Sequence, residues 1–351
     1  MNDPVAHAQA FLEHNRPEQA LALISPHLAA APDDVEALNV ATLALIGVGD
    51  LQGAAATARH AVEVAPDASE PWMLLSAALI GIEDGPGAQR AAGVAVSLAP
   101  QSWAAHAQSA LADVAAQSVS TASLEQARLA IELGPEESQA HFAHAEVASA
   151  LKQKKTARES YHRALALDPH DIDVRNNLAV SGMRTNLGQS AASFIDILAQ
   201  GPTSPLALHN LKAAVTSAMR SVHLIVWGVW FIAFQTTRLT DFAESPAGQL
   251  TRAGFAVLCC VVVAAYVLRL RSGAGAHFPR FAATVVSFDR AVNVWLGLLV
   301  FVIAVMIFGA IAPIVAVRIA YGLALIALVI GMILSHRIAK RLRASAPSPL
   351  G

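Results

Sequence analysis

A proline that recurs about every 34 residues constrains the fold of this chain more than any other feature of its sequence. The successive spacings are 34, 34, 35, 34 and 33 residues, which is hard to attribute to chance in a chain with 17 prolines. The positions are Pro32, Pro66, Pro100, Pro135, Pro169 and Pro202. Small residues follow each proline at a nearly constant offset: Ala54, Ala88, the pair Ala122 and Ser123, Ala157 and Ala191. Self-similarity at a fixed period of this length indicates an array of stacked repeats.

Two segments between these prolines resemble tetratricopeptide repeats, which are two-helix units. They are ALNVATLALIGVGDLQGAAATARHAVEVAPD, from Ala37, and AHFAHAEVASALKQKKTARESYHRALALDPHD, from Ala140. Leu38 takes the bulky position of the first helix (helix A) that Trp72 takes in the next repeat, and Gly49 lies at the turn before the second helix (helix B). The other matching positions of the two segments are Asp50, Ala54, Ala61 and Pro66, then His141, His144, Ala145, Ala157, Tyr161, Ala164 and Pro169.

The resemblance covers residues 1–215, as about six repeats and a partial helix at Pro205–Ala218. Small residues suit the close crossing of the two helices, and proline ends helix B because it cannot donate the next backbone hydrogen bond. Two repeats depart from the pattern at a position where an aromatic residue is common: repeat four has Asp113 and repeat six has Gly182.

The second half of the chain, residues 216–343, is predicted to be a membrane domain. Apolar residues make up 55% of the chain and charged residues 14%, against about 25% charged residues in ordinary soluble domains. The apolar residues concentrate in four stretches, at about 222–237, 253–268, 291–312 and 314–334. A membrane span needs about 20 residues, so the first two stretches need Arg220, Arg252 or Arg269 to extend toward the interface. The alternative is a set of buried helices in a soluble domain. The expected fold class is therefore all-α, a solenoid of tetratricopeptide-type helical hairpins followed by a four-helix transmembrane bundle.

The distribution of Lys and Arg predicts the orientation of the spans. The segment between spans two and three carries four arginines and the C-terminal region carries four basic residues, whereas the opposite loops hold Arg238, Arg252 and Arg318. Basic residues collect on the cytoplasmic side, so we expect the repeats and the short tail 344–351 in the cytoplasm. The N-terminus does not resemble a secretory signal peptide. The Ala-rich composition, with more Arg than Lys, is typical of a bacterial protein, and we expect a multi-pass protein of the plasma (inner) membrane.

The segment before the third stretch has an apolar face formed by Phe281, Val285, Phe288 and Val292. It is either a short helix lying on the membrane surface or the polar beginning of the third span.

We find no pattern that indicates catalysis, so we expect neither an enzyme nor a cofactor. His141 and His144, with Glu146 nearby, could share one face of a helix, but they occupy repeat packing positions, and we expect no metal there. Cys259 and Cys260 are neighbours in an apolar stretch and are expected to be small apolar side chains of a membrane helix. A net charge of −2 gives no general attraction to nucleic acid.

The resemblance implies that a protein or peptide binds the concave surface formed by the A helices, so the expected function is a membrane-tethered scaffold. The alternative is a subunit of a membrane transporter or channel with regulatory repeats, and the membrane helices could also form a homo-oligomer. The residues expected to line the groove are Glu36, Asn39, Leu43, Ile46, Glu70, Met73, Ile80, Leu111, Phe142, Glu146, Asn176 and Met183. This set favours an apolar, weakly basic ligand such as an amphipathic helix. Alternatively, Leu43, Ile46 and Leu111 pack against the adjacent helix and leave a smaller, more polar groove.

Overall fold

The computed structural model describes residues 3–200, 204–237 and 244–345, and over these ranges the chain is helical without strands. It divides into two compact units at residues 178/179. The predicted limit at 215 marks a change of composition, and as a domain boundary it stays a prediction. The division falls earlier because α12 packs against helices of the second unit.

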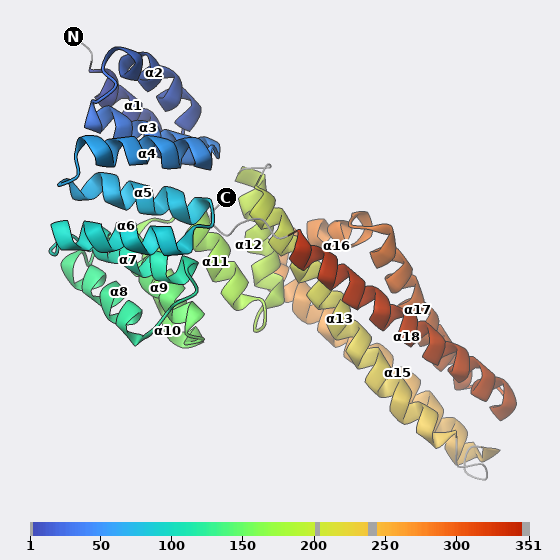
Figure 1. The fold of residues 1–351 in the computed structure, drawn as a ribbon. Coiled ribbons are helices and arrows are strands. Elements are labelled where there is room, and N and C mark those ends of the chain that lie inside the picture. Colours follow the sequence, from blue (N-terminus) through green and yellow to red (C-terminus); the bar gives the residue numbers. More distant parts are fainter. Residues whose placement is uncertain (1–2, 201–203, 238–243, 346–351) are drawn as a thin grey trace. The chain divides into compact units, whose positions relative to one another are not determined.

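The first unit is a stack of helix pairs, which confirms the predicted all-α solenoid (Figure 1). Odd-numbered helices are the A helices and even-numbered helices the B helices. Their bounds are α1 (Pro4–Glu13), α2 (Pro17–Ala30), α3 (Val35–Val48), α4 (Leu51–Val64), α5 (Ser69–Gly81), α6 (Gly85–Leu98), α7 (Trp103–Ala115), α8 (Thr121–Leu133), α9 (Ser138–Ala150), α10 (Lys154–Leu167) and α11 (Ile172–Gly182).

Each B helix of the first unit ends at the same distance before the repeating proline. The residue preceding the proline has φ between −138° and −127° in every case, outside the helical region. The physical reason is the clash between the proline ring and the preceding residue, which disfavours the α conformation there. The residues are Ala31, Ala65, Ala99, Gly134 and Asp168.

The turn from helix A to helix B also repeats, and in the first five repeats it contains one residue in the left-handed conformation. Only Gly49 among these residues is a glycine; the others are Asn15, Glu83, Gln117 and Lys152, with φ between 55° and 64°. A side chain makes this conformation unfavourable by roughly 1–2 kcal/mol, so the repeats with Glu83, Gln117 and Lys152 carry local strain that glycine would avoid. In several repeats, helix B then begins with a capping side chain. Asp50, for example, accepts a hydrogen bond from the amide of Gly53 at 2.9 Å.

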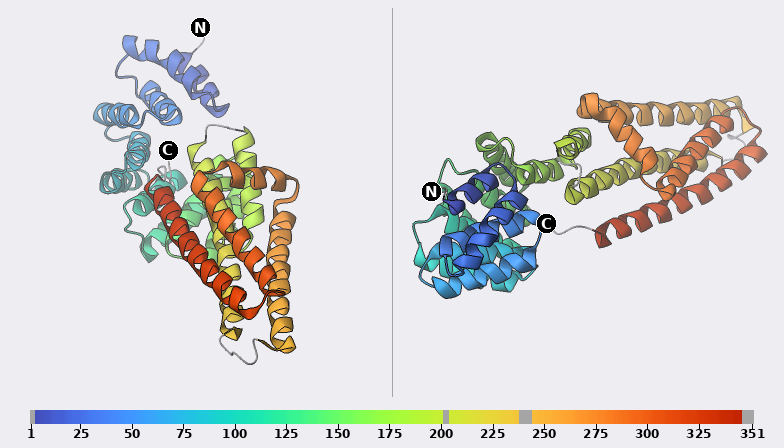
Figure 2. Two further views of the ribbon diagram at one scale, coloured as in Figure 1. Left: turned by 90° about the vertical axis from the view of Figure 1, so that its right-hand side faces the viewer. Right: turned by 90° about the horizontal axis from the view of Figure 1, so that it is seen from above.

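The second unit contains α12 (Leu187–Gln200) and a bundle of four long helices, α13 (Pro205–Thr236), α15 (Pro246–Ala274), α17 (Arg290–Gly309) and α18 (Ile314–Ala344), which run alongside one another (Figure 2). All four are long and apolar enough to cross a membrane. Their common core is built from large side chains, among them Trp230, Trp295 and Tyr321. The indole N–H of Trp295 donates to His223 Nδ1 at 3.2 Å across the bundle.

The helices differ from the sequence prediction at one place and decide between two predicted alternatives at another. The partial repeat helix at Pro205–Ala218 and the first apolar stretch form one continuous helix, α13. The amphipathic segment forms a separate helix, α16 (Phe278–Ser287), which follows the 3-10 turn Gly275–His277. Because Asp289 caps the amide of Ala291 at the beginning of α17, α16 is not the first turn of the third span.

At the end of the bundle where α17 ends and α15 begins, two arginines donate to backbone carbonyls, and one of them departs from the sequence prediction. The sequence predicts that Arg252 extends toward an interface, but it is 2% exposed and its Nε donates to the carbonyl of Gly309 at 2.9 Å. Arg318 donates to the carbonyl of Thr237 at 3.0 and 3.2 Å. Both carbonyls lie at the C-terminal ends of helices, where a positive charge is favourable.

The glycines Gly188 and Gly273 bring α12 close to α15. A Cβ on Gly188 would lie 2.5 Å from the carbonyl oxygen of Leu270, and one on Gly273 would lie 3.2 Å from the Cα of Gly188. An ion pair between His277 and Asp196, at 3.2 Å, joins the same region. The helix B of the last repeat is therefore part of the bundle's own packing.

Candidate binding surface of the repeat array

The A helices of the first unit form the inner side of a curved array. Successive A helices pack directly on one another, from α1 through α3, α5 and α7 to α9, whereas no two successive B helices over the same range are packed to that extent. Helices that are closer together lie on the concave side of a curved stack. The face of the A helices is therefore the surface on which an elongated ligand could contact several repeats at once.

A ring N–H fixes the first turn of three A helices. The indole N–H of Trp72 donates to the carbonyl of Pro66 at 2.9 Å, six residues before it. In the next two repeats, Nε2 of His106 and of His141 lies 2.9 Å from the carbonyl oxygen of Pro100 and Pro135, respectively. A carbonyl oxygen can only accept, so both histidines carry the proton on Nε2. Tryptophan in one repeat and histidine in the next two thus present an N–H at the same place.

The pair His141 and His144 is consequently part of the packing. His144 Nδ1 lies 2.8 Å from the hydroxyl of Ser160 on helix B of the same repeat. Burial, together with the proximity of His141, lowers the pKa of His144. Across the described ranges, no three His, Cys, Asp or Glu side chains are grouped closely enough to hold a metal ion.

Part of the predicted groove is accessible. Leu43 is 40% exposed in the middle of α3, and Met73 on α5 is half-buried without joining a core cluster. Glu36 and Glu70 are exposed at the first turns of the same two helices. Together these four side chains define what we call the Leu43 surface: an apolar centre on two adjacent A helices with a carboxylate at the N-terminal end of each.

Other predicted groove residues support the array from inside. Ile80 and Phe142 are buried in core clusters, and Asn39 and Asn176 are buried as well. Ile46 and Leu111 are half-buried and pack against neighbouring clusters, as the alternative interpretation expected. Met183 packs in the core of the second unit.

Glu146 connects two repeats. Its Oε1 accepts hydrogen bonds from the hydroxyl of Tyr161 at 2.5 Å and from the amide of Asn177 at 2.7 Å. Burial raises the pKa of the Glu146 carboxyl and, with the neighbouring carboxylate, that of Tyr161. This carboxylate therefore holds α9, α10 and α11 together and is not a free anion on the groove.

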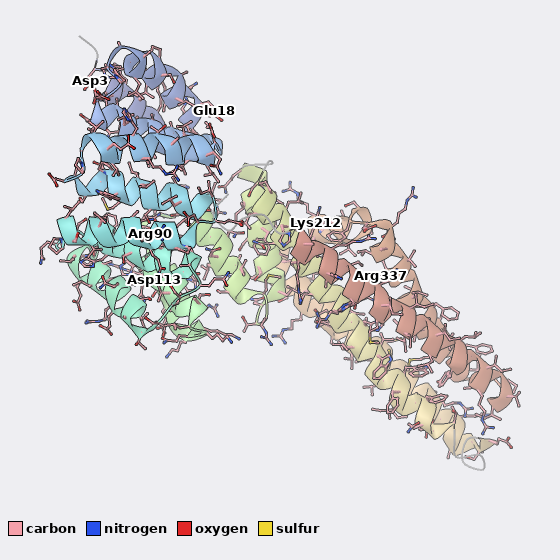
Figure 3. The ribbon with its side chains drawn as sticks, viewed as in Figure 1. Asp3, Glu18, Arg90, Asp113, Lys212 and Arg337 are labelled. Atoms are coloured by element: carbon pink, nitrogen blue, oxygen red, sulfur yellow. The ribbon has the colours of Figure 1, made fainter. Side chains whose placement is uncertain are left out.

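Asp113, labelled in Figure 3, has a similar structural role. The residue departs from the aromatic pattern, but Oδ1 accepts from the side-chain amide of Gln89 and Oδ2 from the hydroxyl of Ser123, both at 2.6 Å. A polar link between repeats three and four replaces the aromatic contact.

The first unit is strongly acidic, a property that the whole-chain charge of −2 conceals. Residues 1–178 contain 22 Asp and Glu but 10 Lys and Arg, whereas residues 179–351 contain 4 acidic and 14 basic residues. None of the predicted groove positions is Lys or Arg. Counting charges separately in the two halves of the sequence would have found this asymmetry.

Comparison with solved structures supports the helical fold through the match to the Cut9–Hcn1 hetero-tetramer. No family model matches the chain, and no curated protein matches it. The Cut9–Hcn1 hetero-tetramer of the APC/C matches with a TM-score of 0.50 at 15% identity, over 60% of this chain and 42% of that chain. The structure of TTC0263, described as a thermophilic TPR protein of Thermus thermophilus, matches with a TM-score of 0.46 at 21% identity, over 51% of this chain and 96% of that chain. YrrB, described as a TPR protein with an unusual peptide-binding site, matches with a TM-score of 0.35 at 17% identity, over 48% and 86%.

Proposed function

We propose that this protein is a membrane-tethered cytoplasmic scaffold whose repeats bind a protein segment on the Leu43 surface. The observation that carries the proposal is the combination of exposed Leu43 and accessible Met73 with the flanking carboxylates of Glu36 and Glu70. An apolar centre rimmed by negative charge complements an amphipathic helix with basic residues beside its apolar face. The acidic balance of the whole first unit would steer such a segment toward the array.

The outward surface of the bundle supports membrane tethering. Large apolar side chains face outward on all four long helices, including Phe231, Val261, Phe301, Ile319 and Ile326, each at least 42% exposed. Soluble proteins rarely expose apolar patches of such extent. A lipid environment would solvate these side chains, and continuous helices satisfy their own backbone groups there.

The placement of charge supports a cytoplasmic repeat array. At the end of the bundle that joins α12, α16 and the C-terminal part of α18, the chain carries many exposed basic residues, among them Arg220, Arg271, Arg290 and Lys340. At the opposite end, Arg252 and Arg318 are engaged by helix carbonyls. Among the described residues of the bundle, the basic side chains that are not bonded to the carbonyl end of a helix thus lie on one side, and Arg238 of the opposite loop lies outside the described residues. The positive-inside rule assigns that basic side to the cytoplasm of a plasma (inner) membrane protein.

The interior of the bundle favours an anchor over a transport pathway. A pathway through one copy needs polar side chains facing one another, but the centre of the bundle is filled by Trp230, Trp295, Tyr321 and aliphatic residues. Asn293 is exposed and donates to the carbonyl of Val286 at 2.8 Å, so it does not line a channel.

The test compares variants of the full-length protein. Partners are first identified by affinity purification in mild detergent and mass spectrometry, and their affinity is then measured. Leu43→Asp and Met73→Asp should each weaken binding by roughly tenfold or more, because each places a charge in an apolar contact. Leu98→Asp, at a similarly exposed leucine on the B helix α6, is the matched control and should bind as the wild type does.

Salt sharpens the same test. Buried apolar contacts persist at about 0.5 M salt, where the Debye length is only a few Å, whereas exposed charge pairs are screened. We expect the affinity of the wild type to fall modestly as the salt concentration rises. We expect the Glu36→Lys variant to bind the partner more weakly than the wild type does. Equal effects of the Leu43→Asp and Leu98→Asp substitutions would rule out this surface.

A further inference from the structure

A cavity between α13 and α18 is basic at one end and apolar at the other. Its volume is about 690 Å³, and its basic residues are Arg220 on α13 with Lys340 and Arg343 on α18. The wall beyond them is formed by Leu224, Trp227 and Met332. The two helices are antiparallel neighbours in the bundle, and both change from basic to apolar at the level of this cavity.

The basic residues of the cavity have no acidic partner within the described ranges. Asp289 pairs with Arg341 at 3.8 Å and Asp196 pairs with His277, while Arg220, Lys340 and Arg343 take part in no ion pair that the structure describes. No acidic side chain lines the cavity. Three positive charges that converge without neutralisation attract an anion.

His223 is a further polar residue of the cavity wall. Its Nδ1 accepts from the indole of Trp295, which leaves the proton of the neutral ring on Nε2. Gly331 on α18 provides the space for this ring, because a Cβ there would lie 2.9 Å from His223 Cε1. His223 is 4% exposed and lines the cavity, so its ring is held in place by packing.

The apolar wall continues into the outward surface of the bundle. Leu224 is 61% exposed, Met332 is 56% exposed, and Trp227 is 39% exposed and stacks on Phe231. A soluble anion would gain nothing from this wall. A molecule with a phosphate at one end and acyl chains at the other would contact both parts of the cavity.

We infer that this cavity binds an anionic phospholipid, with the phosphate between Arg220, Lys340 and Arg343 and an acyl chain along Trp227 and Met332. The inference rests on the proposed membrane function, because it requires these helices to lie in a bilayer. Basic cavities between membrane helices at the cytoplasmic side suit anionic head groups. A second cavity of about 440 Å³ shares Arg220 and Arg343 and adds Arg184, which leaves room for a charged or hydroxylated head group.

The experiment measures lipid binding to the purified full-length protein by native mass spectrometry. Phosphatidylglycerol should bind about tenfold more tightly than phosphatidylcholine. The double variant Arg220→Gln, Arg343→Gln should lose about tenfold or more of this affinity, since each basic residue near a charged head group contributes severalfold. The matched control Arg280→Gln, Arg337→Gln removes the same charge from α16 and α18 outside the cavity lining and should retain wild-type binding. Arg337 is labelled in Figure 3.

Two further arms separate the possible failures. Glycerol 3-phosphate in large excess should not displace the lipid, and displacement by it would indicate a site for free phosphate and overturn the lipid assignment. Membranes containing each protein are also washed with alkaline carbonate. A wild type that is released by the wash contradicts the membrane function itself. If the proteins are retained in the membrane but the two double variants bind phosphatidylglycerol equally well, only the lipid site is contradicted.

Discussion

In the repeat unit most fully buried side chains are alanines, whereas in the bundle they include Trp230, Trp295, Tyr321 and Met306. The repeat unit divides its buried residues among several small clusters, and the bundle collects them into one main cluster that draws on all four long helices. Alanine lets two helices cross closely but contributes little buried area of its own. Stability in the array therefore comes from many nearest-neighbour contacts, and stability in the bundle from a few large ones.

The two units also differ in the sign of their charge. The array is acidic and places carboxylates beside its exposed apolar Leu43 surface, while the bundle is basic at one end and apolar over its outer surface. Each unit thus has a surface suited to a different environment. Under the proposed function, the array would bind the partner and the bundle would lie in the membrane.

The largest effect that tests this comparison comes from the central tryptophan of the bundle. Trp295→Ala should lower the free energy of unfolding by about 3–5 kcal/mol, because Trp295 is completely buried in the core of the bundle. Trp72→Ala in the array should cost about half as much, since Trp72 is only half-buried. Thermal unfolding of the two variants in detergent, monitored by circular dichroism, measures both losses. If Trp72→Ala lowered the free energy of unfolding more than Trp295→Ala does, the contrast between a few large contacts in the bundle and many small contacts in the array would be contradicted.

A smaller effect of opposite sign is expected at the turns of the array. Lys152→Gly should raise the free energy of unfolding by about 1 kcal/mol, because the left-handed conformation of Lys152 suits glycine. Gly49→Ala should lower it by a similar amount at the equivalent turn. Both changes can be followed by chemical denaturation of the array. If Lys152→Gly destabilises the protein, the side chain of Lys152 contributes more than its backbone conformation costs.

The smallest expected effect is a pH dependence at Glu146. Burial raises the pKa of this carboxyl in the folded state. Glu146 therefore adds to the free energy of unfolding at pH values below the ordinary pKa of glutamate, about 4.3. This contribution is lost as the pH rises through the raised pKa of the folded state. Glu146→Gln keeps an oxygen that can accept from Tyr161 and Asn177, so it should remove this part of the pH dependence and leave the array at least as stable at neutral pH. If the free energy of unfolding changes with pH in the same way in the wild type and in the variant, Glu146 is not a buried group that titrates.

The sequence predicted the architecture well, because the features that determine it are periodic. The recurring prolines mark the ends of the B helices, and the four apolar stretches correspond to the four long helices. The candidate surface was harder to predict. A position on a helix wheel does not show whether a large side chain such as Phe142 turns into the core or whether Glu146 finds donors on two other helices. Arg252 was misjudged for the same reason, since its partner carbonyl lies 57 residues away in the sequence.

The orientation of the bundle in the membrane tests the central claim most directly, because the scaffold requires the array on the side where the basic residues lie. A reporter that is active only outside the cytoplasm is fused after Gly351 in one protein and inserted after Glu244, between α13 and α15, in another. We predict a silent C-terminal fusion and an active insertion, with both proteins retained in the membrane. An active C-terminal fusion together with a silent insertion would place the repeats outside the cytoplasm and contradict the account.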